Sequence, residues 1–292
     1  MTRKAKALVL RTAGTNCDRE TCIALERAGA TVLLAHVQRL IEAPALLDDC
    51  VLLVVPGGFS YGDDVAAGRI LGYELRQHLA GPVREFVDSG GFVLGVCNGF
   101  QVLVDTGLLQ PAAEERSFAL SGNAGGRFEC RWVHLRVEHS ACAWLEPGTI
   151  TPMPVAHAEG RFLARSEGAL EVLERRRQIV LTYVDPAAPR AASCSYPHNP
   201  NGSLKDIAGI CDPTGRVLGL MPHPERNITP WNHPHWTRLP VRAQGEGLDF
   251  YRRLVQAAAS TSGRGTAAPT RPQDPTCEKP TSSSSCHCPS SR

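Results

Sequence analysis

Short apolar segments alternate with helical patterns in the amino-terminal part of the chain. The strand-like segments are 5–10, 31–35, 50–58 and 92–96, and helical patterns end near residue 28, cover 72–89 and cover 100–109. Runs that are apolar on both faces are typical of parallel strands, whose crossover helices cover the sheet on either side. This order predicts an α/β fold with a mostly parallel central sheet and helices on both faces.

The first helical pattern has polar residues where a helix would begin. Asn16 and Asp18 are both residue types that cap helices, and Gly29 is a typical stop. We therefore expect a capped helix that ends at about Ala28.

The pattern becomes more strand-like after about residue 128. Three segments are expected to be later, partly antiparallel strands of the same domain: 128–139, 178–184 and 216–221. An amphipathic helix over 247–259 closes the predicted domain, residues 1–259. Residues 260–292 are rich in Ser, Thr, Pro and Gly, so we predict a disordered tail.

Charge and hydropathy argue against two kinds of partner. The formal net charge of +2 does not favour a broad electrostatic surface for nucleic acid. No apolar run reaches the length of about 20 residues that spans a bilayer, and the first residues show no export signal. The expectation is a cytoplasmic protein that binds neither nucleic acid nor a membrane.

The chain has 11 cysteines, and they do not follow the pattern of a small disulfide scaffold. Reduced thiols are the expected state. Cys286, His287 and Cys288 lie close together but have no second Cys/His pair at zinc-site spacing. They are read as part of the tail, and no metal site is predicted.

Cys97 lies where the predicted strand 92–96 meets the helical pattern 100–109. At such an elbow the side chain projects beyond the carboxyl end of a parallel strand, and a helix amino terminus favours a thiolate. Gly95 and Gly99 supply the small neighbours that an elbow needs. The residues alone leave two readings open, a nucleophile and an inert core thiol.

A second chemical motif, MPHPER, covers residues 221–226 directly after an apolar run. His223 and Glu225 are two residues apart, so in an extended segment they point to the same side. The carboxylate could orient the imidazole and leave its other nitrogen for a thiol. An ordinary surface loop is the alternative.

The third motif, PGGFSYGDD, covers residues 56–64 and follows a buried strand. Glycine backbone can approach a ligand closely, and its N–H groups could bind an oxyanion. A tight loop that needs positive φ is the alternative. A nucleotide-phosphate loop is not predicted, because neither the lysine of a P-loop nor a G-x-G-x-x-G spacing is present.

Together these motifs resemble the glutaminase subunits of phosphoribosylformylglycinamidine synthase, which are class I, triad-type glutamine amidotransferases with a flavodoxin-like domain. The resemblance covers roughly residues 5–255. It rests on TNCDRET (15–21), PGGFSYGDD (56–64), GVCNGFQVL (95–103), VAHAEGRF (155–162), NPNGS (199–203) and IAGICDPTGRVLGLMPHPER (207–226).

The resemblance implies a catalytic triad. Cys97 would attack the carboxamide carbon of glutamine and form a γ-glutamyl thioester. His223 would activate the thiol, protonate the departing ammonia and then activate water. Glu225 would orient that histidine and stabilise its charge.

The resemblance also implies roles around the triad. The backbone N–H groups of Gly58 and Asn98 would form the oxyanion hole, and Gln101 would help to seat glutamine. His157 would line the glutamine pocket, or be structural. Ala158 replaces the first glycine of the usual H-G-E-G, which a loop with positive φ would tolerate poorly.

The implied reaction needs a partner. The ammonia would pass to the synthetase subunit, PurL, which would use ATP and magnesium to convert formylglycinamide ribonucleotide to formylglycinamidine ribonucleotide. A small bridging subunit, PurS, could complete the assembly. No cofactor is expected in this chain itself.

Three other functions remain open. One is an amidotransferase of the same class that serves a different acceptor, against which GGFSYGDD and NPNGS count. Another is a binding protein that keeps the fold without turnover, against which the Cys97, His223 and Glu225 set counts. A chaperone or thiol sensor with a cysteine elbow would lack the paired H-P-E.

Overall fold

The computed structural model describes residues 4–110 and 116–261, so most of the predicted tail, including the Cys286–Cys288 segment, lies outside the described residues. The strands are β1 Lys6–Arg11, β2 Thr31–His36, β3 Leu52–Val55, β4 Phe92–Val96, β5 Phe118–Ser121, β6 Glu129–Val137, β7 Ile150–His157, β8 Arg161–Ala164, β9 Ile179–Val184, β10 Ile207–Cys211 and β11 Val217–Leu220. The α-helices are α1 Asp18–Arg27, α2 Val37–Glu42, α3 Arg69–Glu74, α4 Ala80–Asp88, α5 Asn98–Thr106, α6 Glu167–Arg175 and α7 Glu246–Thr261. The short helical segments are η1 Pro44–Leu47, η2 Ser60–Asp63, η3 Leu75–Leu79, η4 Leu204–Asp206, η5 Pro224–Arg226, η6 Pro230–Asn232 and η7 Trp236–Arg238.

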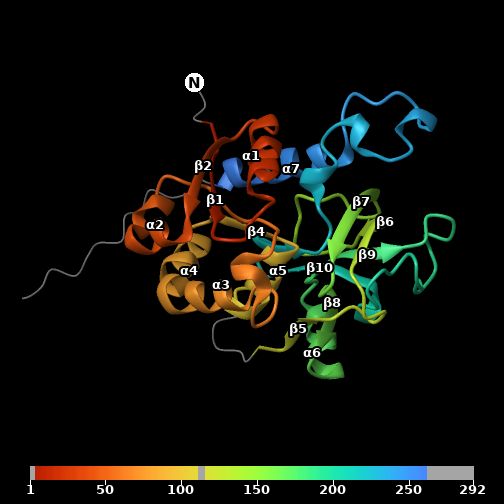
Figure 1. Ribbon diagram of the computed structural model, residues 1–292, viewed down its shortest axis with the longest axis horizontal. Helices are drawn as coiled ribbons and strands as arrows, with labels where there is room; N and C mark the ends of the chain where they lie inside the picture. Colours follow the sequence, from red (N-terminus) through yellow and green to blue (C-terminus); the bar gives the residue numbers. More distant parts are fainter. Residues whose placement is uncertain (1–3, 111–115, 262–292) are drawn as a thin grey trace, which may run out of the picture.

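Nine strands form one central sheet in the order β2-β1-β3-β4-β11-β10-β9-β6-β7 (Figure 1). The pairs from β2 to β11 are parallel. The pairs from β11 to β7 are antiparallel. The predicted α/β fold is confirmed, and the later strands join the same sheet with antiparallel pairing, as expected.

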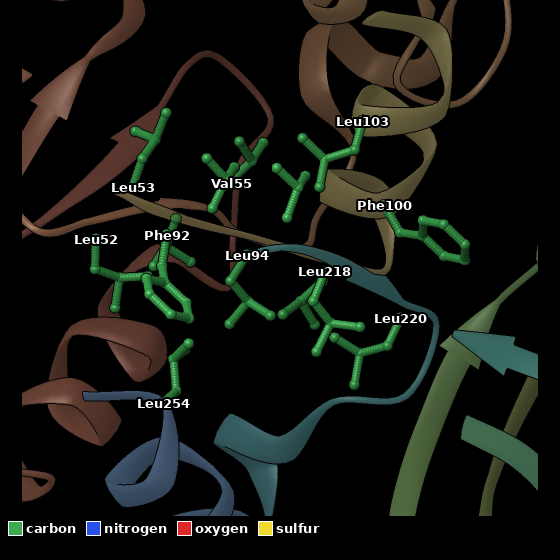
Figure 2. Close-up of a cluster of buried hydrophobic side chains, with 14 of the residues drawn as sticks. Leu52, Leu53, Val55, Phe92, Leu94, Phe100, Leu103, Leu218, Leu220 and Leu254 are labelled. Carbon is green, nitrogen blue, oxygen red and sulfur yellow. The ribbon is translucent and has the colours of Figure 1, made fainter. Parts of the chain in front are cut away.

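Helices cover the parallel part of the sheet on both faces. α1 packs with α7 on one side, and α3 packs with α5 on the other (Figure 1). Figure 2 shows Leu254 of α7 on one side of the strands and Phe100 and Leu103 of α5 on the other. Each of these side chains is almost completely buried, and burial of one such side chain stabilises the fold by about 1.5–3 kcal/mol.

The helical pattern predicted over 72–89 is one continuous helical stretch that begins earlier, at Arg69, and contains a wide turn. The turn is the π-helical segment η3, Leu75–Leu79, between α3 and α4. Pro82 explains it, because proline has no N–H to donate to His78 four residues earlier and its ring would clash with that carbonyl.

The predicted capping of the first helix by Asn16 or Asp18 is wrong. The N-cap residue of α1 is Cys17, and its side chain makes no capping hydrogen bond. The Asp18 carboxylate lies instead 3.3 Å from Nε of Arg11, and the Asn16 amide oxygen accepts a hydrogen bond from the Cys17 thiol at 3.3 Å.

The sequence prediction missed β5, β7, β8 and β10. In β7 the reason is that Pro152 and Pro154 argue against a strand. Both prolines are tolerated because β7 is the last strand of the sheet, where one edge needs no N–H donors. The carbonyl groups of that edge are used by the candidate site described below.

The elbow at Cys97 depends on two glycines. β4 coincides with the predicted strand 92–96, and α5 begins at Asn98, two residues before the helical pattern predicted from residue 100. A Cβ atom on Gly99 would lie 1.8 Å from the Val55 carbonyl oxygen, and one on Gly95 would lie 2.5 Å from the Gly99 carbonyl oxygen. The first turn of α5 therefore lies directly against the strand ends.

Within residues 4–110 and 116–261, the structure contains no helix that combines the length and the apolar character needed to cross a membrane. The closing helix predicted over 247–259 is present as α7, which begins at Glu246 and continues to Thr261.

We predict that Gly99→Ala destabilises the domain by roughly 3 kcal/mol, because backbone atoms cannot yield to a Cβ at 1.8 Å. The matched control is Gly81→Ala in α4, where nothing lies within 4 Å of the new Cβ. That change should be neutral or stabilise by up to about 1 kcal/mol, because alanine favours helix. Urea unfolding measures both, and equal losses in the two variants would contradict the packing argument.

Candidate active site

The three residues predicted as a triad meet at the carboxyl ends of two neighbouring parallel strands. Cys97 follows β4, and His223 and Glu225 follow β11. The strands are in register at Val96 and Leu220, and the Cys97 N–H donates to the Leu220 carbonyl at 2.8 Å. Residues far apart in the chain are therefore adjacent at the edge where sites form in such sheets.

Cys97 has the strained backbone of a nucleophile elbow. It is the N-cap residue of α5, with φ +50° and ψ −105°. A non-glycine residue with such dihedrals costs about 1–3 kcal/mol, which the packed strand and helix on either side must offset. The residue is only 5% exposed, and its Sγ lies 3.7 Å from the carbonyl oxygen of Ala156.

His223 and Glu225 form a buried pair. Nδ1 of His223 lies 2.6 Å from Oε1 of Glu225, so the ring nitrogen donates to the carboxylate. That bond leaves Nε2 as the reactive nitrogen, and Nε2 is buried with no hydrogen-bond partner among the described residues. This is the arrangement in which one nitrogen is held by a carboxylate and the other is available for a thiol.

The electrostatics of the site favour a protonated His223. Burial lowers the pKa of His223, but the Glu225 carboxylate and contacts with Cys97 and Cys17 outweigh burial and raise the pKa well above its usual value. An imidazolium can therefore form beside Cys97, which favours a thiolate there.

Tyr251 supports Glu225 from the closing helix α7. Its hydroxyl donates to Oε2 of Glu225 at 3.4 Å, so both carboxylate oxygens have donors. Burial, and then the nearby Glu225 carboxylate, raise the pKa of Tyr251, which keeps the hydroxyl protonated as a donor.

On the unpaired edge of β7, the carbonyl groups of alternate residues accept hydrogen bonds from the candidate site. The Pro154 carbonyl accepts the His223 N–H at 2.9 Å, and the Pro152 carbonyl accepts from the Asn227 side chain at 2.9 Å. The Ala156 carbonyl is an acceptor for the Cys97 thiol. The prolines remove outward N–H groups from this edge but leave its acceptors in place.

The loop after β3 passes between the key side chains. A Cβ on Gly57 would lie 2.9 Å from Cε1 of His223 and 3.4 Å from Cβ of Cys97. Gly58, the predicted oxyanion donor, has φ +141°, and a Cβ there would lie 2.7 Å from the Asn16 backbone nitrogen. Only glycine leaves room for this backbone beside Cys97.

Asn98 and Gln101, also predicted site residues, are linked through their side chains. The Asn98 amide oxygen accepts from the Ser60 hydroxyl at 2.6 Å, and its nitrogen donates to Asp63 at 3.2 Å and to Gln101 at 3.0 Å. The Gln101 amide nitrogen donates to the Glu159 carbonyl. The Asn98 backbone N–H, at the first position of α5, has no acceptor within the helix and is available to a ligand.

His157 ends β7 and is a neutral, buried imidazole. The Asn123 side-chain nitrogen donates to two carbonyls, so its oxygen faces Nδ1 of His157 at 3.1 Å and accepts from it. Burial, and then repulsion from His223, lower the pKa of His157 to about 4. Nε2 is therefore a buried acceptor with no partner among the described residues. Ala158 is not among the residues with positive φ, so alanine fits this loop.

A pocket of about 320 Å³ borders Gln101 and Glu159 and is also lined by Arg69, Asp105 and Arg116. Its size is in the range of small-molecule sites. Asp105 contacts the guanidinium groups of both pocket arginines and of Arg76. Arg69 and Arg116, with the carboxylates of Asp105 and Glu159, give the pocket charges of both signs.

Besides Tyr251, the sequence prediction missed a second residue beside the predicted triad. Cys17 is fully buried, and its Sγ lies 4.0 Å from Nδ1 of His223. The Arg226 guanidinium donates to the same sulfur at 3.1 Å. Cys17 and Arg226 lie in TNCDRET and MPHPER, but only the fold brings these segments together.

Comparison with known proteins supports the same class. The family model for the CobB/CobQ-like glutamine amidotransferase domain matches residues 4–256. The phosphoribosylformylglycinamidine synthase subunit PurQ of Dehalococcoides mccartyi is 42% identical over 257 residues, covering 87% of this chain and 98% of the relative. PurQ of Methanococcus maripaludis is 42% identical over 234 residues, covering 79% of this chain and 86% of the relative.

A solved structure extends the likeness to three dimensions. The structure of PurLQS from Thermotoga maritima contains a chain that is similar to this one with a TM-score of 0.65 and 30% sequence identity, covering 88% of this chain and 99% of that chain. The matched motifs, the fold and these relatives all indicate the same family. The chain belongs to the glutamine amidotransferase family of PurQ, the phosphoribosylformylglycinamidine synthase subunit.

Proposed function

We propose that this chain is the glutaminase subunit of phosphoribosylformylglycinamidine synthase and acts through Cys97, His223 and Glu225. The observation that carries the proposal is the buried His223–Glu225 pair beside the Cys97 elbow, with Nε2 of His223 left without a partner among the described residues. PurQ relatives that match nearly the whole domain support the choice of reaction.

In the first half-reaction, the Cys97 sulfur attacks the carboxamide carbon of glutamine and forms a thioester. The imidazolium of His223 gives its proton to the departing nitrogen, so ammonia leaves as the carbon–nitrogen bond breaks. In the second half-reaction, neutral His223 takes a proton from water, which attacks the thioester and releases glutamate and the thiol. Glu225 holds the imidazole in one orientation through both steps.

The oxyanion of each tetrahedral intermediate would bind the backbone N–H groups of Gly58 and Asn98. The positive φ of Gly58 and the first-turn position of Asn98 support this assignment. The Asn98 side chain is occupied by Ser60, Asp63 and Gln101, so it would act as a brace for the loop over the site.

Glutamine would enter through the pocket that borders Gln101. The guanidinium groups of Arg69 and Arg116 suit the α-carboxylate of an amino acid, and Glu159 in the same pocket suits its ammonium group. His157 would contribute its neutral Nε2 as an acceptor near the site.

The ammonia would pass to the synthetase subunit PurL. The assembly named in the Thermotoga maritima structure supports this partner and a third subunit, PurS. ATP and magnesium would bind on the synthetase, which would convert formylglycinamide ribonucleotide to the amidine, and the cytoplasm would be the site of the reaction. Glutamine hydrolysis should then be weak in the isolated chain and stronger in the complex.

Cys97→Ala tests the nucleophile. In the complex with the synthetase, it should reduce glutamine-dependent amidine formation by at least about a thousandfold and leave ammonia-dependent formation unchanged. Cys130→Ala, at an exposed cysteine, is the matched control and should retain both activities. Retained glutamine-dependent activity in Cys97→Ala would reject Cys97 as the nucleophile. Failure of a glutamine-analogue chloroketone to label Cys97 in the complex would favour a binding protein.

Glu225→Gln tests the electrostatics of the pair. The amide keeps an acceptor for Nδ1 but removes the negative charge that raises the pKa of His223. His223 should therefore lose its proton at lower pH, with the midpoint of its imidazole NMR titration falling by about one unit or more.

His157 is an internal reference in the same spectra, because its pKa of about 4 keeps it neutral throughout the neutral range. Glu26→Gln, at an exposed position of α1, is the control for a general change of charge. An unchanged His223 midpoint in Glu225→Gln would show that another group controls its protonation.

A further inference from the structure

A buried thiol separates a guanidinium group from the His223–Glu225 pair. Cys17 Sγ accepts a hydrogen bond from Nη2 of Arg226 at 3.1 Å and lies 4.0 Å from Nδ1 of His223. The Cys17 sulfur, a His223 ring nitrogen and a Glu225 carboxylate oxygen all lie within 4.8 Å of one another. The sulfur thus lies near both members of the pair and accepts a hydrogen bond from the cation behind them.

Arg226 is held in place from the opposite side. Its Nε donates to Oε1 of Glu20 in α1 at 2.8 Å. Arg226 follows Glu225 directly in the chain, so its guanidinium is a natural competitor for the Glu225 carboxylate. The structure places Cys17 and Glu20, not Glu225, as its hydrogen-bond partners.

We propose that Cys17 is a positioning residue for the glutaminase reaction: its thiol keeps the Arg226 guanidinium away from Glu225, so that Glu225 remains paired with His223. The inference rests on the proposed function of His223 and Glu225 and extends it to a residue that does not touch the substrate.

A thiol suits this role because of its size and its weak polarity. Sulfur is large enough to separate the two groups, and it competes only weakly for hydrogen bonds with a carboxylate. An arginine–carboxylate pair, by contrast, is among the strongest charge-assisted contacts and can form two parallel hydrogen bonds. If Glu225 turned toward Arg226, His223 would lose its orienting partner.

The thiol remains neutral in this position. Burial raises the pKa of Cys17, although contacts with His223 and Arg226 oppose that effect. A neutral spacer adds no charge to the pair. The charged or titratable groups that act on His223 come from each surrounding element: Cys17 before α1, Cys97 at the start of α5, Glu225 in η5, and His157 at the end of β7.

A metal site is the rival explanation of the same cluster, because thiolate, imidazole and carboxylate are ligands that zinc takes. The Arg226 guanidinium at 3.1 Å from the sulfur counts against a cation there, and Nδ1 of His223 is already bonded to Glu225. Zinc content of the purified chain, measured by mass spectrometry, belongs in the test. Stoichiometric zinc that is lost in Cys17→Ala would overturn the spacer role.

The test uses a double-mutant cycle of Cys17→Ala and Arg226→Met, because methionine keeps much of the arginine volume without its charge. Cys17→Ala alone should lower kcat for glutamine hydrolysis by the complex about tenfold, with KM changed less than about twofold, and lower the His223 titration midpoint by about one unit. Adding Arg226→Met should restore most of both losses, since no guanidinium would then compete for Glu225.

Two further variants make the result specific. Cys17→Ser keeps an atom at the spacer position and should lose less activity than Cys17→Ala. Cys22→Ala removes a half-buried thiol from α1, the helix that follows Cys17, and should leave kcat and the His223 midpoint unchanged.

Either of two outcomes would overturn the spacer role. One is an unchanged His223 titration midpoint in Cys17→Ala. The other is a loss of kcat in the double variant that equals the combined losses of the two single variants. The imidazole titration needs no turnover, so it reports on Cys17 even in a poorly active variant. The Cys97→Ala variant, measured alongside, separates failure of the Cys17 proposal from failure of the proposed function. If Cys97→Ala still hydrolyses glutamine, the proposed function through Cys97 fails, whatever the result for Cys17.

Discussion

The close contact between the first turn of α5 and the end of β3 is the constraint on which the site depends. Gly99 brings the helix backbone so near to the Val55 carbonyl that no side chain fits between them. This contact holds α5 immediately beyond Cys97 and fixes the unusual backbone of that residue. The helix amino terminus, the Cys97 sulfur and the glycine loop after β3 are then brought together by packing rather than by flexible side chains.

The site also lies where the sheet changes from parallel to antiparallel pairing. β11 is the last parallel strand and delivers His223 next to Cys97. The antiparallel part then returns β7 to the same place, where its unpaired edge accepts the His223 backbone N–H. Residues 152 and 154, the prolines of that edge, provide acceptors without donors. The segment after β11 fills these acceptors, so the edge is not left open to pairing with another strand.

The sequence predicted the parallel strands, the elbow and the grouping of Cys97, His223 and Glu225, because each carries a local signal such as an apolar run, a glycine pair or the H-P-E spacing. The sequence-based predictions were wrong where contacts between distant segments outweigh the local pattern. Pro152 and Pro154 concealed β7, and Asn16 and Asp18 resembled helix caps although their side chains bond elsewhere. Cys17 and Tyr251 were not recognised because their contacts with His223 and Glu225 join distant segments, which no short pattern records.

The pairing of β4 with β11 has a consequence for the order in which the protein acquires reactivity. During synthesis, Cys97 emerges long before His223, and Tyr251 emerges later still. Because domains fold as units and long-range strand pairs form late, Cys97 meets His223 only when nearly the whole domain has been made. A nascent or truncated chain therefore carries an ordinary cysteine, and reactivity toward glutamine is acquired only by a finished fold.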